Sequence, residues 1–144
     1  MNTDIIIDSS VALKWFFPEE ESSNESLKIK KDFTEKKIMI SIPVLFFYEV
    51  GNVLKSSVKS LRIDSGKAKT VYEKFTHAEF ITYSSKELFK DAFEKADSFD
   101  ITFYDASYVV LADYLKIPFY TADKKLLQKI KGEYVFHLKE YPLK

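Results

Sequence analysis

Four acidic residues stand where carboxylates could do chemistry together: Asp8, Glu49, Asp105 and Asp123. Carboxylate oxygens are the ligands that Mg²⁺ and Mn²⁺ prefer, whereas zinc and copper favour nitrogen or sulfur. Carboxylates that lie close together repel one another, and a divalent cation relieves that repulsion. Such a site suits phosphoryl transfer, because bound metal ions activate a water molecule and neutralise charge on a phosphate. The acids therefore predict a Mg²⁺ or Mn²⁺ site that acts on phosphate esters.

The elements that would position these acids alternate along the chain. Short apolar, β-branched-rich segments predict strands at residues 4–8, 38–42, 80–83, 118–121 and 134–137, the last at an edge of the sheet. Helices are predicted at 9–17, 22–36, from 43 onward, 64–76, from 84 onward, 102–115 and 123–130. Pro18 would stop the first helix, a capping box at 22–25 would open the second, and Pro43 would be the first residue of the third. This alternation indicates an α/β domain with a mostly parallel central sheet of four to five strands.

In a parallel sheet all strands end at one edge, where the helices begin and ligands bind. Asp8 closes the first strand and Asp123 follows the fourth. Asp105 lies in the first turn of a helix that two residues connect to the fourth strand, so this helix start points back to the same edge. Glu49 is about six residues into its helix, roughly 9 Å from the edge. We expect the four acids to converge on one rim.

Helix capping is the alternative interpretation for three of the acids. Asp8 could cap the first helix, Asp123 the last, and Asp105 fits the acidic position of a capping box opened by Thr102. Taken singly, Asp105 and Asp123 are better explained as caps, which stabilise by about 0.5–2 kcal/mol. Glu49 lies in the apolar stretch 45–50 with no basic residue three or four positions away, so a buried charge there needs another partner. The expected convergence favours a site.

Composition limits the class of protein. The 144 residues suit one domain, and with no cysteine there is neither a disulfide nor a thiolate metal site. No apolar run approaches the roughly 20 residues of a membrane helix, and the N-terminus lacks the basic region of a signal peptide, so we expect a cytoplasmic protein with no membrane contact. The net charge of +0 is not a general nucleic-acid footprint, so a polyanion must be met by a local patch or through a metal ion.

Four segments resemble, in order and spacing, the motifs of PIN domains of the VapC toxin type: IIDSSVALKWF (6–16), YEVGNVL (48–54), TFYDASYVVLA (102–112) and TADKKL (121–126). The resemblance covers essentially the whole chain and implies a three-layer α/β/α fold, with residues 1–144 as a single PIN domain. It implies a Mg²⁺- or Mn²⁺-dependent endoribonuclease whose catalytic and metal-binding residues are Asp8, Glu49, Asp105 and Asp123. It further implies the toxin of a type II toxin–antitoxin pair, a homodimer, and an antitoxin that blocks the pocket.

Other residues have weaker assignments. Ser9, Asn52 and Thr121 match accessory positions of the family, which would orient acids or water molecules. Lysines near the acids could steer an RNA backbone, although on the last helix they are most simply a solvated face; they are Lys14, Lys124 and Lys125. The two histidines, His77 and His137, are expected to be structural or at the surface.

Three consecutive bulky residues, Trp15, Phe16 and Phe17, are first interpreted as core. They cannot all face inward on one helix, so a dimer or antitoxin surface is the alternative.

Two other functions remain open for a PIN domain: a nuclease in RNA processing or DNA repair, and a non-catalytic binding module. The small size favours a toxin, and the complete acid set argues against a binding module. A receiver-type signalling domain would need an adjacent acidic pair after the first strand, where this chain has Asp8-Ser9-Ser10.

Overall fold

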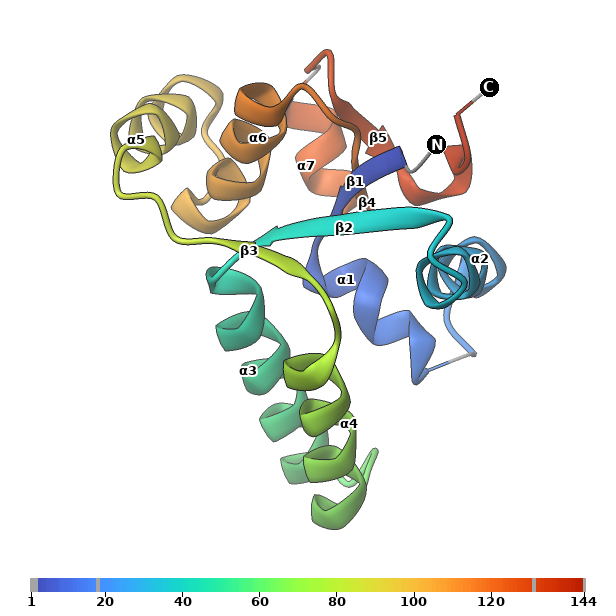
Figure 1. Cartoon of the computed structure of the whole chain (residues 1–144). Coiled ribbons are helices and arrows are strands. Elements are labelled where there is room, and N and C mark those ends of the chain that lie inside the picture. The colour runs from blue at the N-terminus through green and yellow to red at the C-terminus, as the bar shows by residue number, and fades with distance from the viewer. Residues whose placement is uncertain (1–2, 18, 131, 144) are drawn as a thin grey trace.

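The centre of the molecule is a sheet of five parallel strands in the order β3-β2-β1-β4-β5 (Figure 1). This computed structural model describes residues 3–17, 19–130 and 132–143. The strands are β1 (Thr3–Ile7), β2 (Ile38–Pro43), β3 (Ile81–Tyr83), β4 (Phe119–Thr121) and β5 (Val135–His137). The predicted α/β class with a parallel sheet is confirmed, and β5 lies at an edge as expected.

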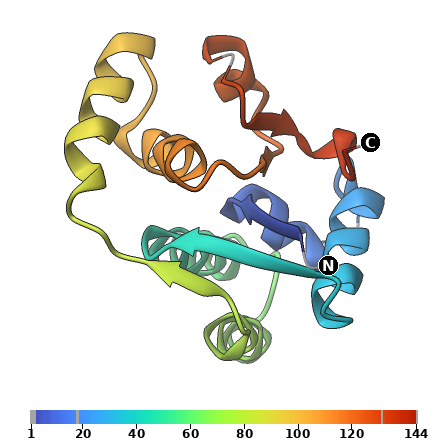
Figure 2. The same cartoon turned by 45° about the horizontal axis from the view of Figure 1, so that its top comes forward.

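Helices cover both faces of the sheet. They are α1 (Ser9–Ala12), the 3₁₀ turn η1 (Leu13–Trp15), α2 (Ser23–Thr34), α3 (Leu45–Lys59), α4 (Ser65–His77), α5 (Leu88–Phe99), α6 (Phe103–Leu115), α7 (Lys124–Lys129) and the 3₁₀ turn η2 (Leu138–Glu140). Helices α5, α6 and α7 lie on one side of the sheet and α1 to α4 on the other, with α3 and α4 projecting as a hairpin (Figures 1 and 2). Within the described ranges, no helix is long and apolar enough to cross a membrane.

Burial on both faces explains why the central strands read as apolar runs. Residues 5–7 of β1 are at most 1% exposed, as parallel strands between two helical layers require. Helix α3 buries Phe46, Val50 and Leu54 at a four-residue spacing, which keeps them on one stripe of the helix. Burying each such side chain contributes about 1.5–3 kcal/mol. This packing fixes the positions of four element ends relative to one another: the ends of β1 and β4 and the starts of α3 and α6.

Three predicted helix starts are wrong. Ser22 adopts a left-handed conformation (φ 62°) and makes no side-chain cap bond, so there is no capping box at 22–25. Instead the Ser23 hydroxyl donates to the carbonyl of Glu20 at 2.6 Å, because the chain turns back sharply before α2. Pro43 is the last residue of β2, where it pairs with Tyr83, and α3 begins two residues later. The helix expected from residue 84 begins at residue 88.

The first predicted helix, 9–17, is an α-helical turn followed by the 3₁₀ turn η1. The change of period turns Trp15 and Phe17 into the core, where they are 9% and 5% exposed, and leaves Phe16 half-buried against the Phe75 ring at 5.4 Å. The core interpretation of Trp15 and Phe17 is therefore confirmed. The expected stop at Pro18 lies outside the described residues.

Candidate functional site

The carboxyl edge of the sheet brings the four predicted acids into electrostatic contact. Asp8 follows β1, Asp123 follows β4, Asp105 lies in the first turn of α6, and Glu49 lies in the second turn of α3. Burial is the largest cause of the raised pKa of Asp8, Glu49 and Asp105; the charge of Asp105 adds to the rise for Asp8 and Glu49, and the charge of Asp123 adds to it for Asp105. Asp105 is thus the central member, and each of the other acids interacts with it.

Asp8 is the most deeply buried of the four, at 6% exposed. Its Oδ1 accepts hydrogen bonds from the Ser10 hydroxyl and from the Val11 N–H (3.3 Å), so it caps α1. Its Oδ2 accepts from the Thr121 hydroxyl. Burial raises the pKa of Asp8 to about 6, against the lowering effect of these three hydrogen bonds. Capping and membership of the site are therefore compatible for this residue.

Two hydroxyls tie the end of β1 to the end of β4. Thr121 donates to Asp8 and accepts from the N–H of Asp123 at 3.1 Å, while Ser10 donates to Asp8 and accepts from the N–H of Ala122 at 3.1 Å. Thr121 was expected as an accessory residue and lies where it orients an acid. On the first helix the expected hydroxyl was that of Ser9, whereas the one that contacts Asp8 belongs to Ser10. The available signal was an aspartate at a helix cap with a hydroxyl two residues later.

The partner of Glu49 is Tyr108, which donates a 2.6 Å hydrogen bond to Oε1. Burial raises the pKa of Glu49 to about 7, the Tyr108 hydroxyl opposes that rise, and the charges of Asp8 and Asp105 add to it. Tyr108 was not among the site residues that the sequence predicted. It lies one turn after Asp105 in a helix that is apolar almost all round, and a buried tyrosine there needs a partner for its hydroxyl.

Helix capping and the site coexist at Asp105 and Asp123. The N–H of Asp105 donates to the Thr102 hydroxyl at 3.0 Å, which confirms Thr102 as the cap of α6. Burial and the charge of Asp123 raise the pKa of the Asp105 carboxyl. Asp123 caps α7 through Oδ1, which accepts from the N–H groups of Lys125 and Leu126 at 3.0 and 3.2 Å.

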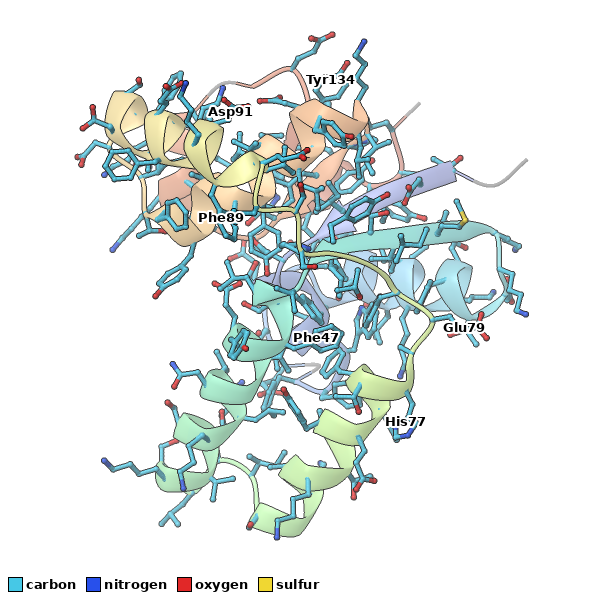
Figure 3. All side chains as sticks on the ribbon, turned by 60° about the vertical axis from the view of Figure 1, so that its left-hand side comes forward. Phe47, His77, Glu79, Phe89, Asp91 and Tyr134 are labelled. Atoms are coloured by element: carbon cyan, nitrogen blue, oxygen red, sulfur yellow. The ribbon has the colours of Figure 1, made fainter. Side chains whose placement is uncertain are left out.

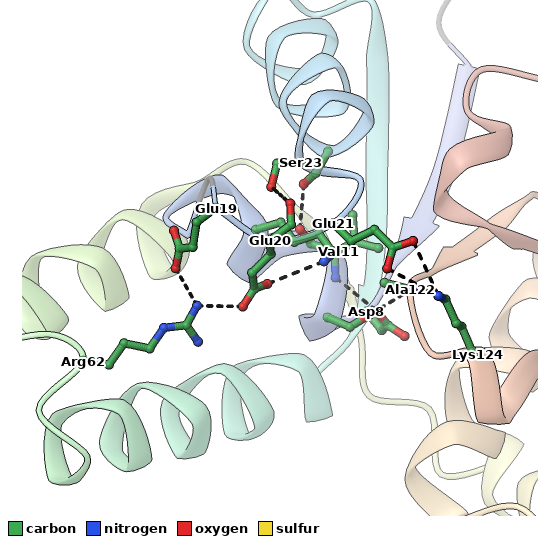
Figure 4. A network of polar contacts seen from close by, with 12 residues as sticks. Asp8, Val11, Glu19, Glu20, Glu21, Ser23, Arg62, Ala122 and Lys124 are labelled. Carbon is green, nitrogen blue, oxygen red and sulfur yellow. Dashed lines mark hydrogen bonds and ion pairs between the residues drawn. The ribbon is translucent and has the colours of Figure 1, made fainter.

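The lysines proposed to steer RNA differ in their surroundings, and Figure 4 shows Lys124 beside Glu21. Lys14 is 8% exposed and its Nζ lies 3.5 Å from Glu20. Because this side chain is buried and paired with a carboxylate, the structure does not support a role for it in steering RNA. Lys124 is exposed and pairs with Glu21 at 3.3 Å, an interaction worth about 0–1 kcal/mol that a phosphate could replace. Lys125 is exposed, and the described part of the chain shows no ion pair for it.

An open hollow of about 500 Å³ lies over Glu49. Ser9 and the exposed Asn52 line it, together with Tyr48 and Tyr104. Ser9 and Asn52 therefore lie beside an acid, at the wall of a space that a substrate can enter.

A family model described as PIN domain matches residues 5–132. The chain belongs to the PIN domain family. Solved structures agree: PAE2754 from Pyrobaculum aerophilum is 26% identical with a TM-score of 0.68, over 96% of this chain and 93% of that one. No curated protein matches.

Two further similar structures carry toxin names. VapBC2 from Rickettsia felis, bound to a DNA fragment from their promoter, is 12% identical with a TM-score of 0.66, over 94% of this chain and 98% of that one. VapC20 from Mycobacterium tuberculosis, a sarcin-ricin loop cleaving toxin, is 13% identical with a TM-score of 0.62, over 90% and 92%. At these identities the likeness shows that this PIN domain shares their fold.

The donor set of the PIN domain fits a hard divalent cation. Among the residues that the structure describes, no three acidic or histidine side chains are grouped closely enough to hold one ion as they stand. Mg²⁺ keeps several water ligands and uses one or two carboxylates directly, so a tight group of three is not required. Burial and mutual repulsion raise the pKa values of the Asp8, Glu49 and Asp105 carboxyls, and a bound cation would lower them.

Proposed function

We propose that this PIN domain hydrolyses phosphodiester bonds of RNA with Mg²⁺ or Mn²⁺. The support is that the four acids follow the ends of parallel strands or lie near the starts of helices at the carboxyl edge of the sheet, and that the charge of Asp105 adds to the burial that raises the pKa of Asp8 and of Glu49. A divalent cation bound there would activate a water molecule and neutralise charge on the phosphate. All four acids are proposed as its site: Asp8, Glu49, Asp105 and Asp123.

Each acid has surroundings that suit a separate role. Asp8, held by the hydroxyls of Ser10 and Thr121, is fixed in orientation and is proposed as a cation ligand together with Asp105. Glu49 has a pKa nearer to neutral pH than a free carboxyl, which suits a group that accepts a proton from the attacking water. Tyr108 positions the Glu49 carboxylate through its 2.6 Å hydrogen bond.

We further propose that the protein is the toxin of a toxin–antitoxin pair, with a cognate antitoxin as partner and a homodimer as its assembly. The support is the fold shared with a VapBC2 complex and with the toxin VapC20. In both comparisons the match spans at least 90% of each chain.

The test is cleavage of a mixed pool of labelled RNAs in Mn²⁺, Mg²⁺ or EDTA. Wild type is compared with Asp105→Asn and with Asp97→Asn, a control at an exposed carboxyl on α5. We expect metal-dependent cuts that disappear in Asp105→Asn and persist in Asp97→Asn. Cleavage in EDTA, or by Asp105→Asn, would contradict the mechanism. Metal-independent RNA binding without any cleavage would identify a binding module instead.

A further inference from the structure

An apolar hollow of about 220 Å³ adjoins the acid rim. It lies where the starts of α3, α5 and α6 meet the end of β3, and Phe89 marks the α5 side (Figure 3). Its described walls are aromatic and aliphatic with three serine hydroxyls and no charged side chain. The volume is below the 300–1,000 Å³ typical of sites for drug-sized ligands, so it suits one planar ring better than a helix of a partner protein.

This hollow borders the one over Glu49, since Leu45, Tyr48 and Tyr104 line both. Tyr48 immediately precedes Glu49, and Tyr104 immediately precedes Asp105. Successive residues of a helix point about 100° apart, so each acid can face the rim while the tyrosine beside it faces the neighbouring space. An RNA strand whose phosphate lies at the acids would therefore continue onto the side chains of Tyr48 and Tyr104, which together form a tyrosine wall.

The two tyrosines are open to solvent. Tyr48 is 74% exposed and Tyr104 is 58% exposed. No hydrogen bond of either hydroxyl is found within the described ranges, and neither ring belongs to the buried core. Their ring faces are thus free for a ligand, and nothing in the fold requires a tyrosine at either position.

Guanidinium contacts to RNA phosphates are scarce in this protein, so contacts of other kinds must hold an RNA. Its net charge is +0, and its single arginine, Arg62, is paired with Glu19 and Glu20 at 2.7 and 2.8 Å. Bases stack on exposed aromatic rings whatever their identity, because every base has a π face. The serine hydroxyls of the apolar hollow can donate to or accept from the edge of a stacked base.

We propose that Tyr48 and Tyr104 form a stacking site for one unpaired nucleobase of an RNA substrate, next to the phosphate that the acids engage. The inference rests on the proposed function and deepens it, because it makes the enzyme selective for a nucleotide that is unpaired beside the cut. A base held in a helical stem cannot reach the wall without leaving its pair.

The test combines protein and substrate changes. Cleavage in Mn²⁺ is measured for wild type, Tyr48→Ala, Tyr104→Ala and the corresponding Phe variants on single-stranded RNAs that are intact or abasic at one position near the cut. Tyr114→Ala is the matched control, because Tyr114 is also an exposed tyrosine of α6 but lines a different hollow. Affinity for the same labelled RNAs is followed by fluorescence anisotropy, and the mass of each variant in solution is recorded.

We expect kcat/KM of both Ala variants to fall by about 10-fold on intact RNA, with the Phe variants within about twofold of wild type. On RNA that is abasic at the stacked position, the Ala variants should match wild type, because the contact is already gone. Equal losses on intact and abasic RNA, or losses no larger than for Tyr114→Ala, would overturn the stacking site while the nuclease function stands.

Failure of the proposed function gives a different pattern. If wild type cuts no RNA but anisotropy shows the same dependence on base and tyrosine, the stacking site holds and the nuclease does not. If wild type neither cuts nor binds RNA, both proposals fail. If the Ala variants change the mass in solution and leave RNA kinetics unchanged, the tyrosine wall is a contact between copies of the chain, and the stacking site is wrong.

Discussion

Replacing Asp8 with asparagine should stabilise the metal-free protein at neutral pH. Burial raises the pKa of Asp8 from 3.8 to about 6, so the charged form is disfavoured in the fold. At about 1.4 kcal/mol per pH unit, this corresponds to about 3 kcal/mol of folding free energy lost when Asp8 is ionised. Asparagine is similar in shape, and its amide oxygen can keep the bonds from Ser10 and Val11. We expect Asp8→Asn to raise the free energy of unfolding by about 1–3 kcal/mol at pH 7.5.

The direction of the pH dependence follows from the raised pKa. Well below pH 3.8 Asp8 is protonated in both the folded and the unfolded chain, so its burial costs little. As the pH rises from 3.8 to about 6, the unfolded chain loses its proton first and the wild type loses stability relative to the variant. The advantage of Asp8→Asn should therefore be small at pH 4, about 0.5 kcal/mol, and reach its full value above pH 7.

The assay is urea denaturation of both proteins in EDTA at pH 4, 6 and 7.5, with Asp97→Asn as the exposed control, repeated at pH 7.5 with Mn²⁺. Mn²⁺ at about 100 times its dissociation constant would stabilise wild type by about 2.7 kcal/mol, and the variant, which lacks a proposed ligand, by less. An Asp8→Asn variant that is less stable than wild type at pH 7.5 in EDTA, or an advantage that does not change with pH, would refute the reasoning.

Three further changes probe the same site. Tyr108→Phe removes the hydroxyl that lowers the pKa of Glu49, so the Glu49 carboxyl should titrate above about 7, and ¹³C NMR of that carboxyl would measure the shift. Asp105→Asn removes a negative charge that raises the pKa of Glu49, so the Glu49 carboxyl should titrate at lower pH; an unchanged pKa would place Asp105 outside the cluster. Thr121→Val deprives the buried Asp8 of a donor, and urea denaturation should show a loss of about 1–3 kcal/mol; an unchanged midpoint would mean that water replaces the hydroxyl.

The sequence by itself determined where the four acids stand relative to helices and strands. Asp8 ends an apolar run, and Asp105 and Asp123 open helices, and these are local patterns that backbone propensities fix. Since parallel strands share one carboxyl edge, the sequence alone predicted that the acids lie at that edge. Local signals were less reliable at helix starts, because the turn at Ser22 and the pairing of Pro43 with β3 depend on neighbouring segments.

Only the tertiary structure decided which groups contact the acids. Strand β1 lies beside β4, and this neighbourhood brings the Thr121 hydroxyl to Asp8 across 113 residues of chain. Helix α6 crosses near α3, and Tyr108 thereby reaches Glu49 across 59 residues. Hydrogen bonds between side chains so far apart in sequence leave no periodic pattern in the sequence. Each of these residues would suit its own helix or strand equally well if it bonded to a different partner. The packing of the sheet and its helices fixes those partners, and with them the burial that raises the acids' pKa values.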